Sequence, residues 1–183
     1  MRSDILRTAR LVLEPVSWRN LDEVAALKAD AGAFGLMLGG VRNRVQTEAE
    51  MAQDVAFRAR HRVGMFVIRE NGRMIGMTGI HDRPDGRGLA LRFALYPFAT
   101  GRGLAAEAAG AVLRYAHSVG IHRVIAVARN TNLASRKVLG AIGMRVCGVF
   151  ERDGCRMLTF ESRAGHEASS RHRRVTSSLG RQS

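Results

Sequence analysis

The residues of this chain best suited to chemistry are two glycines in the segment TGRGLAAEA, residues 100–108. An extended apolar segment precedes them, and an alanine-rich segment with helical periodicity follows. Glycine has no Cβ, and the first turn of a helix leaves several backbone N–H groups without a partner in the helix. Gly101 and Gly103 therefore predict a turn whose amides hold a phosphate or a diphosphate.

Known classes of phosphate site narrow the identity of the ligand. A P-loop requires a lysine followed by serine or threonine after its last glycine, and this segment lacks that lysine, which excludes a P-loop. Residues 101–106 match the dinucleotide fingerprint in form, but residues 97–100 separate them from the preceding strand. The next strand is followed by Arg129 instead of the carboxylate that binds a ribose. An arginine there suits NADP, so a dinucleotide stays as the less favoured alternative.

Apolar periodicity and turn signals predict the elements that must position this turn. The expected order is a strand, two helices, three strands, a helix, a strand, a helix and two strands. Their expected ranges are 10–16, 17–29, 47–62, 64–71, 73–82, 89–96, 103–119, 122–128, 132–144, 145–152 and 155–162.

Short local signals predict several boundaries. Asn71-Gly72 is typical of a tight β-hairpin. Thr47 with Glu50 matches a capping box and predicts that the second helix begins there, and Asn132 is the expected N-cap of the last helix. Residues 30–46 hold four glycines without a steady period, which is typical of a binding loop.

The bulk composition predicts one domain over residues 1–162 and a basic tail over residues 163–183. At 183 residues and 46% apolar content, the chain is long enough for a substantial core. The tail is rich in arginine and serine and has too few apolar residues to pack, so we expect it to be flexible. Arginine supplies nearly all the cationic charge behind the net charge of +13. A basic surface that attracts anionic small molecules accounts for this charge better than a dedicated nucleic-acid site.

The sequence also indicates where the protein works. No segment has the apolar length of a membrane span, and the N-terminal residues are charged where a signal peptide is apolar. The two cysteines, Cys147 and Cys155, are interpreted as reduced thiols. We therefore expect a cytoplasmic protein with no membrane partner. The histidines are scattered without ligand spacing, so we expect no metal site.

Three segments in a fixed order resemble one protein family. They are the opening strand LRTARLVLEPV, the strand–loop–helix segment LYPFATGRGLAAEA and the helix NLASRKVLGAIGM. They resemble the GNAT superfamily of acetyl-CoA-dependent N-acetyltransferases, most closely its RimJ/RimL-like branch of ribosomal-protein N-terminal acetyltransferases. The resemblance covers most of residues 5–162. It implies an α/β (α+β) fold with a mixed, mostly antiparallel central sheet of about seven strands and helices on both faces.

The resemblance also implies a site for acetyl-CoA as co-substrate. The loop amides would bind its diphosphate, and the backbone of the strand before the loop would pair with its pantetheine arm as an added strand. The strand 122–128 would diverge to make room for the thioester. The residues implied in binding are Ala94, Leu95, Tyr96, Thr100, Gly101, Arg102, Gly103, Leu104, Ala105, Asn132 and Ser135.

Acetyl transfer needs a proton donor for the leaving thiolate and a proton acceptor for the attacking amine. Ser135, which the resemblance places near the thioester sulfur, is the candidate donor, and a purely structural role in the first turn of its helix is the alternative. His81 and Asp82, at the end of the strand 73–82, are the candidate acceptors. Proton removal through ordered water stays open. No cysteine lies near the glycine turn or Asn132 in the sequence, which agrees with direct transfer.

The predicted function is transfer of the acetyl group from acetyl-CoA to a primary amine, either a protein N-terminus or a small-molecule amine. Monomer and homodimer both stay open. Leu139 stands where many superfamily members have a tyrosine acid, and Ala90 lies where a glutamate is frequent. Arg92 replaces a frequent glycine. These departures motivate the alternative of a CoA-binding regulatory protein without catalysis, and the basic tail motivates a nucleic-acid-associated protein.

Overall fold

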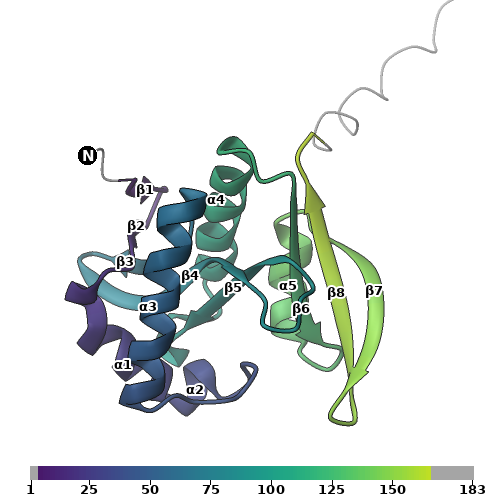
Figure 1. The fold of residues 1–183 in the computed structure, drawn as a ribbon, viewed down its shortest axis with the longest axis horizontal. Coiled ribbons are helices and arrows are strands. Elements are labelled where there is room, and N and C mark those ends of the chain that lie inside the picture. The colour runs from purple at the N-terminus through teal and green to yellow at the C-terminus, as the bar shows by residue number, and fades with distance from the viewer. Residues whose placement is uncertain (1–3, 166–183) are drawn as a thin grey trace, which may run out of the picture.

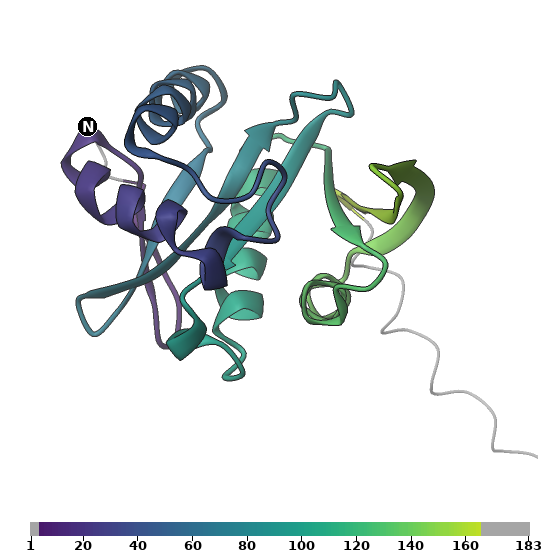
Figure 2. The ribbon, with the colours of Figure 1, turned by 90° about the horizontal axis from the view of Figure 1, so that it is seen from below.

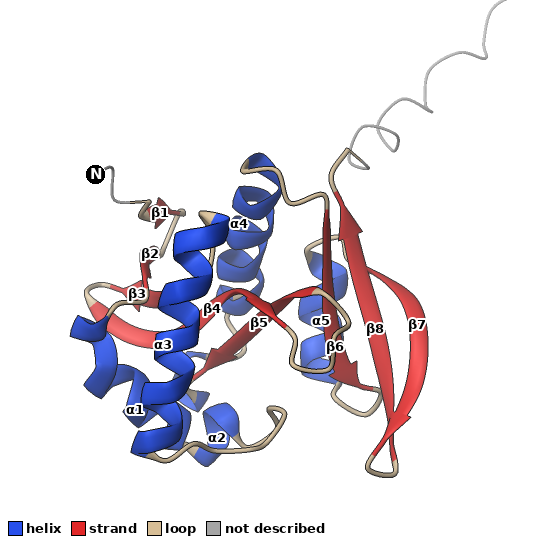
Figure 3. Ribbon diagram, in the orientation of Figure 1, coloured by secondary structure: helices blue, strands red, loops and turns tan. Residues whose placement is uncertain are grey.

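A computed structural model describes residues 4–165, in which one eight-stranded sheet carries helices on both faces (Figures 1 and 3). The strands are β1 (Leu6–Arg7), β2 (Val12–Pro15), β3 (Met65–Glu70), β4 (Arg73–Asp82), β5 (Leu89–Leu95), β6 (Arg123–Arg129), β7 (Arg145–Arg152) and β8 (Cys155–Arg163). The helices are α1 (Leu21–Ala29), α2 (Ala31–Phe34), α3 (Arg44–His61), α4 (Leu104–Ser118) and α5 (Leu133–Ala141), with 3-10 turns at Trp18–Asn20 and Pro97–Ala99.

The sheet has the order β1-β2-β3-β4-β5-β6-β8-β7. Each neighbouring pair is antiparallel except β5 and β6, which are parallel. The expected mixed, mostly antiparallel sheet is therefore confirmed. It has one strand more than the expected number because Leu6 and Arg7 pair with β2. A strand of two residues is too short to leave a periodic signal in the sequence.

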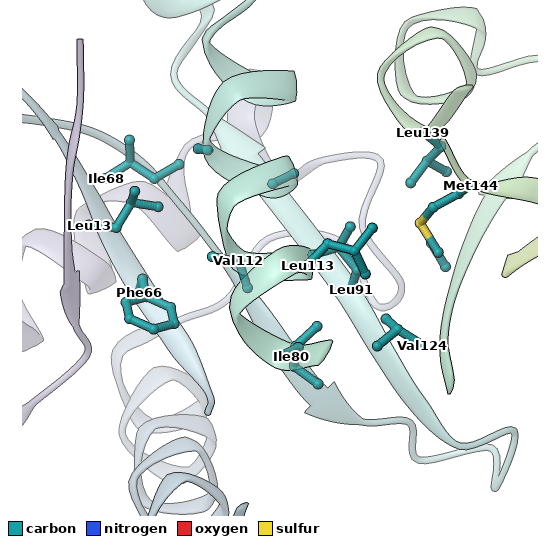
Figure 4. Packing of buried hydrophobic residues seen from close by; sticks show 14 of the residues in the cluster. Leu13, Phe66, Ile68, Ile80, Leu91, Val112, Leu113, Val124, Leu139 and Met144 are labelled. Atoms are coloured by element: carbon teal, nitrogen blue, oxygen red, sulfur yellow. The ribbon is translucent and has the colours of Figure 1, made fainter. Parts of the chain in front are cut away.

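Alternation along the strands divides the core between the two faces of the sheet. Phe66 and Ile68 of β3 pack in the core that α4 covers (Figure 4). Met65 and Val67 of the same strand pack in a second core with residues of α1 and α3. Successive side chains of a strand point to opposite faces, so both faces of β3 are buried.

Helix α3 begins at Arg44, three residues before the expected start. The Asn43 side chain accepts a hydrogen bond from the Gln46 amide at 2.9 Å, and the Gln46 side chain accepts one from the Asn43 amide at 2.9 Å. The capping box predicted at Thr47 and Glu50 was wrong, because Thr47 already lies inside the helix and donates to the Asn43 carbonyl. The N-cap is instead Asn43, four residues before Thr47, and it forms the capping box with Gln46.

The remaining local signals are placed as expected or nearly so. Asn71 and Gly72 both have positive φ, 49° and 81°, and close the β3–β4 hairpin. The loop 30–46 contains the short helix α2, which Asp30 caps through the Ala33 amide at 2.8 Å. Strand β8 runs to Arg163, one residue past the predicted end of the domain, and residues 166–183 of the predicted tail lie outside the described residues. No helix within residues 4–165 is long and apolar enough to cross a bilayer.

Candidate active site

The centre of the candidate site is the place where β5 and β6 separate (Figures 1 and 2). The two strands share a single paired position, Ala90 with Ile125. Beyond that pair a cavity of about 780 Å³ opens between them. Its walls come from the loop after α2, helix α3, the end of β4, the N-terminal part of α5 and the β7–β8 hairpin. The opening lies at the only parallel pair of the described sheet, and β8 pairs with β6 along its other edge.

The glycine turn presents free amides where β5 leads into α4. Gly101 and Gly103 both adopt φ of 78°, and Gly103 is the N-cap of α4. The first amide of this segment with a recorded helical acceptor is that of Glu107, which donates to the Gly103 carbonyl at 3.1 Å. Within residues 4–165, the amides of residues 101–106 have no recorded backbone acceptor. Thr100 differs from the prediction, because its amide donates to the Pro97 carbonyl at 3.2 Å.

Two ion pairs fix this turn from both sides. Glu107 accepts hydrogen bonds from Thr8 Oγ1 at 2.5 Å and from Arg10 Nε at 2.7 Å, and Arg10 also donates to the Arg102 carbonyl at 3.0 Å. The Arg102 guanidinium pairs with Glu70 at the β3–β4 hairpin. Burial raises the pKa of Glu107, but the hydrogen bonds from Thr8 and Arg10 outweigh it and hold the pKa below its ordinary value. Glu107 is therefore an ionised tether that joins α4 to the first strands.

The edge of β5 that faces the cavity offers unpaired peptide groups. The Tyr96 amide donates to the Ile75 carbonyl at 2.9 Å, and Ala94 is registered with Met77 of β4. Because peptide groups alternate in direction along an antiparallel strand, those of Phe93 and Leu95 point away from β4. Of the predicted stretch from Ala94 to Tyr96, only Leu95 turns its peptide group toward the opening, and Phe93 joins it.

Asn132 and Ser135 lie on the cavity wall that α5 supplies. The Asn132 Oδ1 atom accepts a hydrogen bond from the Ser135 amide at 3.1 Å, so Asn132 is the N-cap of α5 as predicted. This bond leaves the Asn132 side-chain NH₂ group for a ligand. Within residues 4–165, no hydrogen bond of the Ser135 hydroxyl is recorded. Leu139, in the place of the frequent tyrosine, also lines the cavity.

His81 and Asp82 also line this cavity, from the end of β4. Burial and the nearby Arg92 guanidinium lower the pKa of His81 to about 3. The imidazole is therefore neutral at pH 7, and its Nδ1 lies 3.1 Å from the Asp82 carbonyl oxygen. Cys155 is a further lining residue. No cysteine lies near Asn132 in the sequence, but the fold brings Cys155, at the start of β8, to the wall of the same cavity.

Helices α1 and α3 place a buried ion pair beside the cavity. Lys28 is 0% exposed, and its Nζ lies 2.5 Å from Glu50 Oε2. Arg42 contacts the other oxygen of the same carboxylate at 2.5 Å. Burial acts to raise the pKa of Glu50, but the hydrogen bonds from Arg42 and Lys28 lower it to about 2.

The Glu50→Gln substitution should lower the free energy of unfolding by about 3 kcal/mol at neutral pH, because it removes the carboxylate that pairs directly with the buried Lys28. The folded pKa of about 2 lies below the ordinary value of 4.5, so this contribution is present above about pH 4.5 and is lost as the pH falls toward 2. Denaturant unfolding at several pH values measures both effects. Glu48→Gln, on the exposed face of α3, is the matched control and should change stability little. Equal stability of the two variants would contradict a stabilising role for the pair.

Comparison with known proteins decides the family. Residues 10–145 match the family model described as "Acetyltransferase (GNAT) domain". The chain belongs to the GNAT acetyltransferase family. It is an acetyl-CoA-dependent acyltransferase, and acetyl-CoA is its co-substrate.

Solved GNAT structures share this fold. A putative GnaT-family acetyltransferase from Bordetella pertussis is 27% identical, with a TM-score of 0.76 over 86% of this chain and 98% of that one. RimJ from Mycobacterium smegmatis, solved with a CoA disulfide, is 24% identical, with a TM-score of 0.72 over 89% and 88% of the two chains. An acetyltransferase from Salmonella typhimurium that modifies the N-terminal serine of a 50S ribosomal subunit protein is 16% identical, with a TM-score of 0.73 over 87% and 99%. No curated protein matches the sequence.

The structure fits the co-substrate of this family at two points. The glycine turn offers several unpartnered amides for a diphosphate, and no heavy atom lies within 4 Å of a Cβ built on Gly101, so the space before the turn is open. The outward peptide groups of Phe93 and Leu95 can pair with the amides of a pantetheine arm. In the part of the chain that the structure describes, no three His, Cys, Asp or Glu side chains gather as a metal site.

Proposed function

We propose that this GNAT enzyme transfers the acetyl group of acetyl-CoA directly to a primary amine in a ternary complex. The observation that carries the proposal is one shared cavity. Asn132 and Ser135 of α5 line it together with His81 and Asp82 of β4. A thioester entering along β5 and an amine entering from the side of α3 can therefore meet without leaving the protein. The acceptor is a protein N-terminus or a small-molecule amine.

We assign Ser135 to the leaving thiolate, and His81 with Asp82 to the proton of the amine. Acetyl-CoA supplies the acetyl carbon and a thiolate leaving group. The Ser135 hydroxyl donates a hydrogen bond to the departing sulfur, and the Asn132 NH₂ group orients the pantetheine or acetyl end. The acceptor must react as the neutral amine. Its nitrogen bonds to the acetyl carbon as the carbon–sulfur bond breaks, one proton goes to the departing thiolate, and an acceptor that enters as an ammonium gives one further proton to solvent. Because a pKa near 3 makes His81 a weak base, we propose that His81 and Asp82 position the water that carries this proton to solvent.

The choice of amine favours an α-amino group on chemical grounds. An α-amino group has a pKa of about 7.7–8.0, whereas an alkyl ammonium has a pKa of about 10.4. The former needs much less help to lose its proton at neutral pH. The Salmonella typhimurium relative, which modifies an N-terminal serine, supports the same class of acceptor.

Steady-state release of CoA thiol with a panel of peptide N-termini and small amines tests the proposal. We expect turnover with at least one class and none without an acceptor. Acetyl-CoA binding without turnover on every amine would favour the regulatory alternative. Salt-sensitive nucleic-acid binding that is lost on removal of residues 164–183 would favour the basic-tail alternative.

Cys155→Ser separates direct transfer from an acyl-enzyme route. Direct transfer predicts that the variant keeps its turnover and that the native enzyme mixed with acetyl-CoA alone shows no added acetyl mass. An acetylated Cys155 that passes its acetyl group to the amine would contradict direct transfer.

A further inference from the structure

Two charged side chains of the cavity, one buried and one partly buried, each have a buried polar atom without a hydrogen-bond partner. Asp54 of α3 is 9% exposed, and its Oδ2 atom has no hydrogen-bond partner. The Nε atom of Arg92, on β5, is buried and also has no partner. Both residues line the cavity that Asn132 and Ser135 share. Leaving a buried polar atom unpaired costs about 1–3 kcal/mol, and more for a charged group, so buried charges in proteins are normally paired.

The neighbouring charges do not satisfy these atoms. Glu50 lies one helical turn before Asp54 and accepts hydrogen bonds from both Lys28 and Arg42. Both carboxylate oxygens of Glu50 therefore already accept a hydrogen bond. Asp54 Oδ2 does not, so it can accept one from a ligand that enters the cavity. Burial raises the pKa of Asp54 against the opposing effect of Arg92 and Lys28, so a cationic ligand would stabilise its ionised form.

More cationic than anionic side chains line the cavity. Six arginines and four carboxylates line it. Three of these arginines pair with Glu50 or Asp85; they are Arg42, Arg83 and Arg152. For the other three no ion pair is recorded within residues 4–165; they are Arg60, Arg92 and Arg129. A ligand that brings a carboxylate would find a partner here, and a polycation would meet repulsion.

We propose that Asp54 and Arg92 form the acceptor subsite, in which Asp54 binds the amine and Arg92 binds a carboxylate of the same acceptor. The acceptor class is then an amine with a carboxylate a few bonds away, as in a free amino acid or an N-terminus followed by an acidic residue. This inference rests on the proposed acetyl transfer and specifies its acceptor. Helices α3 and α5 lie on opposite sides of the opening (Figure 2), so in this proposal the acceptor binds on the side of α3 and the thioester on the side of α5.

Matched acceptor pairs test the inference with the native enzyme. One pair is L-serine and L-serinamide, and a second is an amidated peptide that begins Ser-Asp and its Ser-Asn counterpart. We expect kcat/KM to be at least about tenfold higher for the carboxylate member of one pair, as one charge-assisted hydrogen bond to Arg92 predicts. The pair that shows the preference identifies a free amino acid or a peptide as the source of the carboxylate. Equal kcat/KM in both pairs overturns the inference.

Two variants assign the preference to residues. Arg92→Gln should lower kcat/KM for the carboxylate acceptor to the level of its amide, and Arg92→Lys should restore part of the difference. Asp54→Asn, which keeps the shape of the side chain, should raise KM for both members of the pair by about tenfold or more. Arg44→Gln and Glu48→Gln make the same charge changes at exposed positions of α3. They should change neither the ratio of kcat/KM between the carboxylate and amide acceptors nor the KM of either acceptor.

The affinity for acetyl-CoA provides a separate readout of folding. It should stay at the native value in Arg92→Gln and Asp54→Asn, because neither side chain touches the glycine turn. A preference for carboxylate acceptors that survives Arg92→Gln overturns the assignment. Turnover without any preference for carboxylate acceptors would contradict this inference but not the proposed function. Absence of turnover with every amine would contradict both.

Discussion

Replacing Ser135 by alanine is expected to lower kcat by about 100-fold or more, because a positioned proton donor contributes about that much. The fold should be unaffected. The N-cap hydrogen bond uses the backbone amide of Ser135 and the Asn132 side chain, and both remain in the variant. Steady-state kinetics with a fixed amine and saturating acetyl-CoA gives kcat, and a titration gives the dissociation constant of CoA, which should stay at the native value.

The serine of another helix is the control for this variant. Ser118→Ala removes a hydroxyl from the last turn of α4, where it donates to the Tyr115 carbonyl at 2.7 Å. This variant should keep the native kcat. If Ser135→Ala also keeps the native kcat, Ser135 serves only the start of its helix, and the proton donor must be sought elsewhere in the cavity.

Replacing Gly101 by alanine is expected to weaken acetyl-CoA binding by at least about tenfold. Its φ of 78° is strained for a residue with a side chain, at a cost of about 1–2 kcal/mol in stability. The added methyl group would stand in the open space before the turn, where the diphosphate must approach the amides. Loss of one hydrogen bond to a charged group accounts for about a tenfold change. Calorimetric titration of acetyl-CoA measures the effect.

Gly120→Ala separates binding from backbone strain. Gly120 follows the other end of α4, has φ of 100° and has the same open space around a Cβ. Both variants should lose similar stability, but only Gly101→Ala should lose affinity for acetyl-CoA. Equal affinities of the two variants would contradict the assignment of the turn to the diphosphate.

Features that depend on a few neighbouring residues could be predicted from the sequence. The Asn71-Gly72 hairpin and the Asn132 cap are of this kind, because residue type alone determines which backbone angles and hydrogen bonds are favourable. The start of α3 could not be decided in this way. The pattern of a capping box occurs twice, four residues apart, at Asn43 and at Thr47. The tertiary contact of Glu50 with Lys28 removes Glu50 from capping.

Features that depend on register or on distant residues were not predictable. Glu107 lies in the first turn of α4, but its hydrogen-bond partners Thr8 and Arg10 lie 99 and 97 residues away in the sequence. The peptide group of Phe93 points outward because of the register between β4 and β5. The residues of β5 alone do not determine that register. Asp54 shows no signal in the sequence, because its importance comes from burial beside a cavity whose walls come from segments far apart in the sequence.

The central claim is that the amides of the glycine turn bind the diphosphate of acetyl-CoA while the thioester reaches the opening between β5 and β6. A crystal structure of the protein with CoA tests this claim most directly. It should show diphosphate oxygens within hydrogen-bonding distance of amides in residues 101–105, and the pantetheine arm beside Phe93 and Leu95. A bound CoA whose diphosphate lies away from this turn, or whose thiol ends far from Ser135, would contradict the claim.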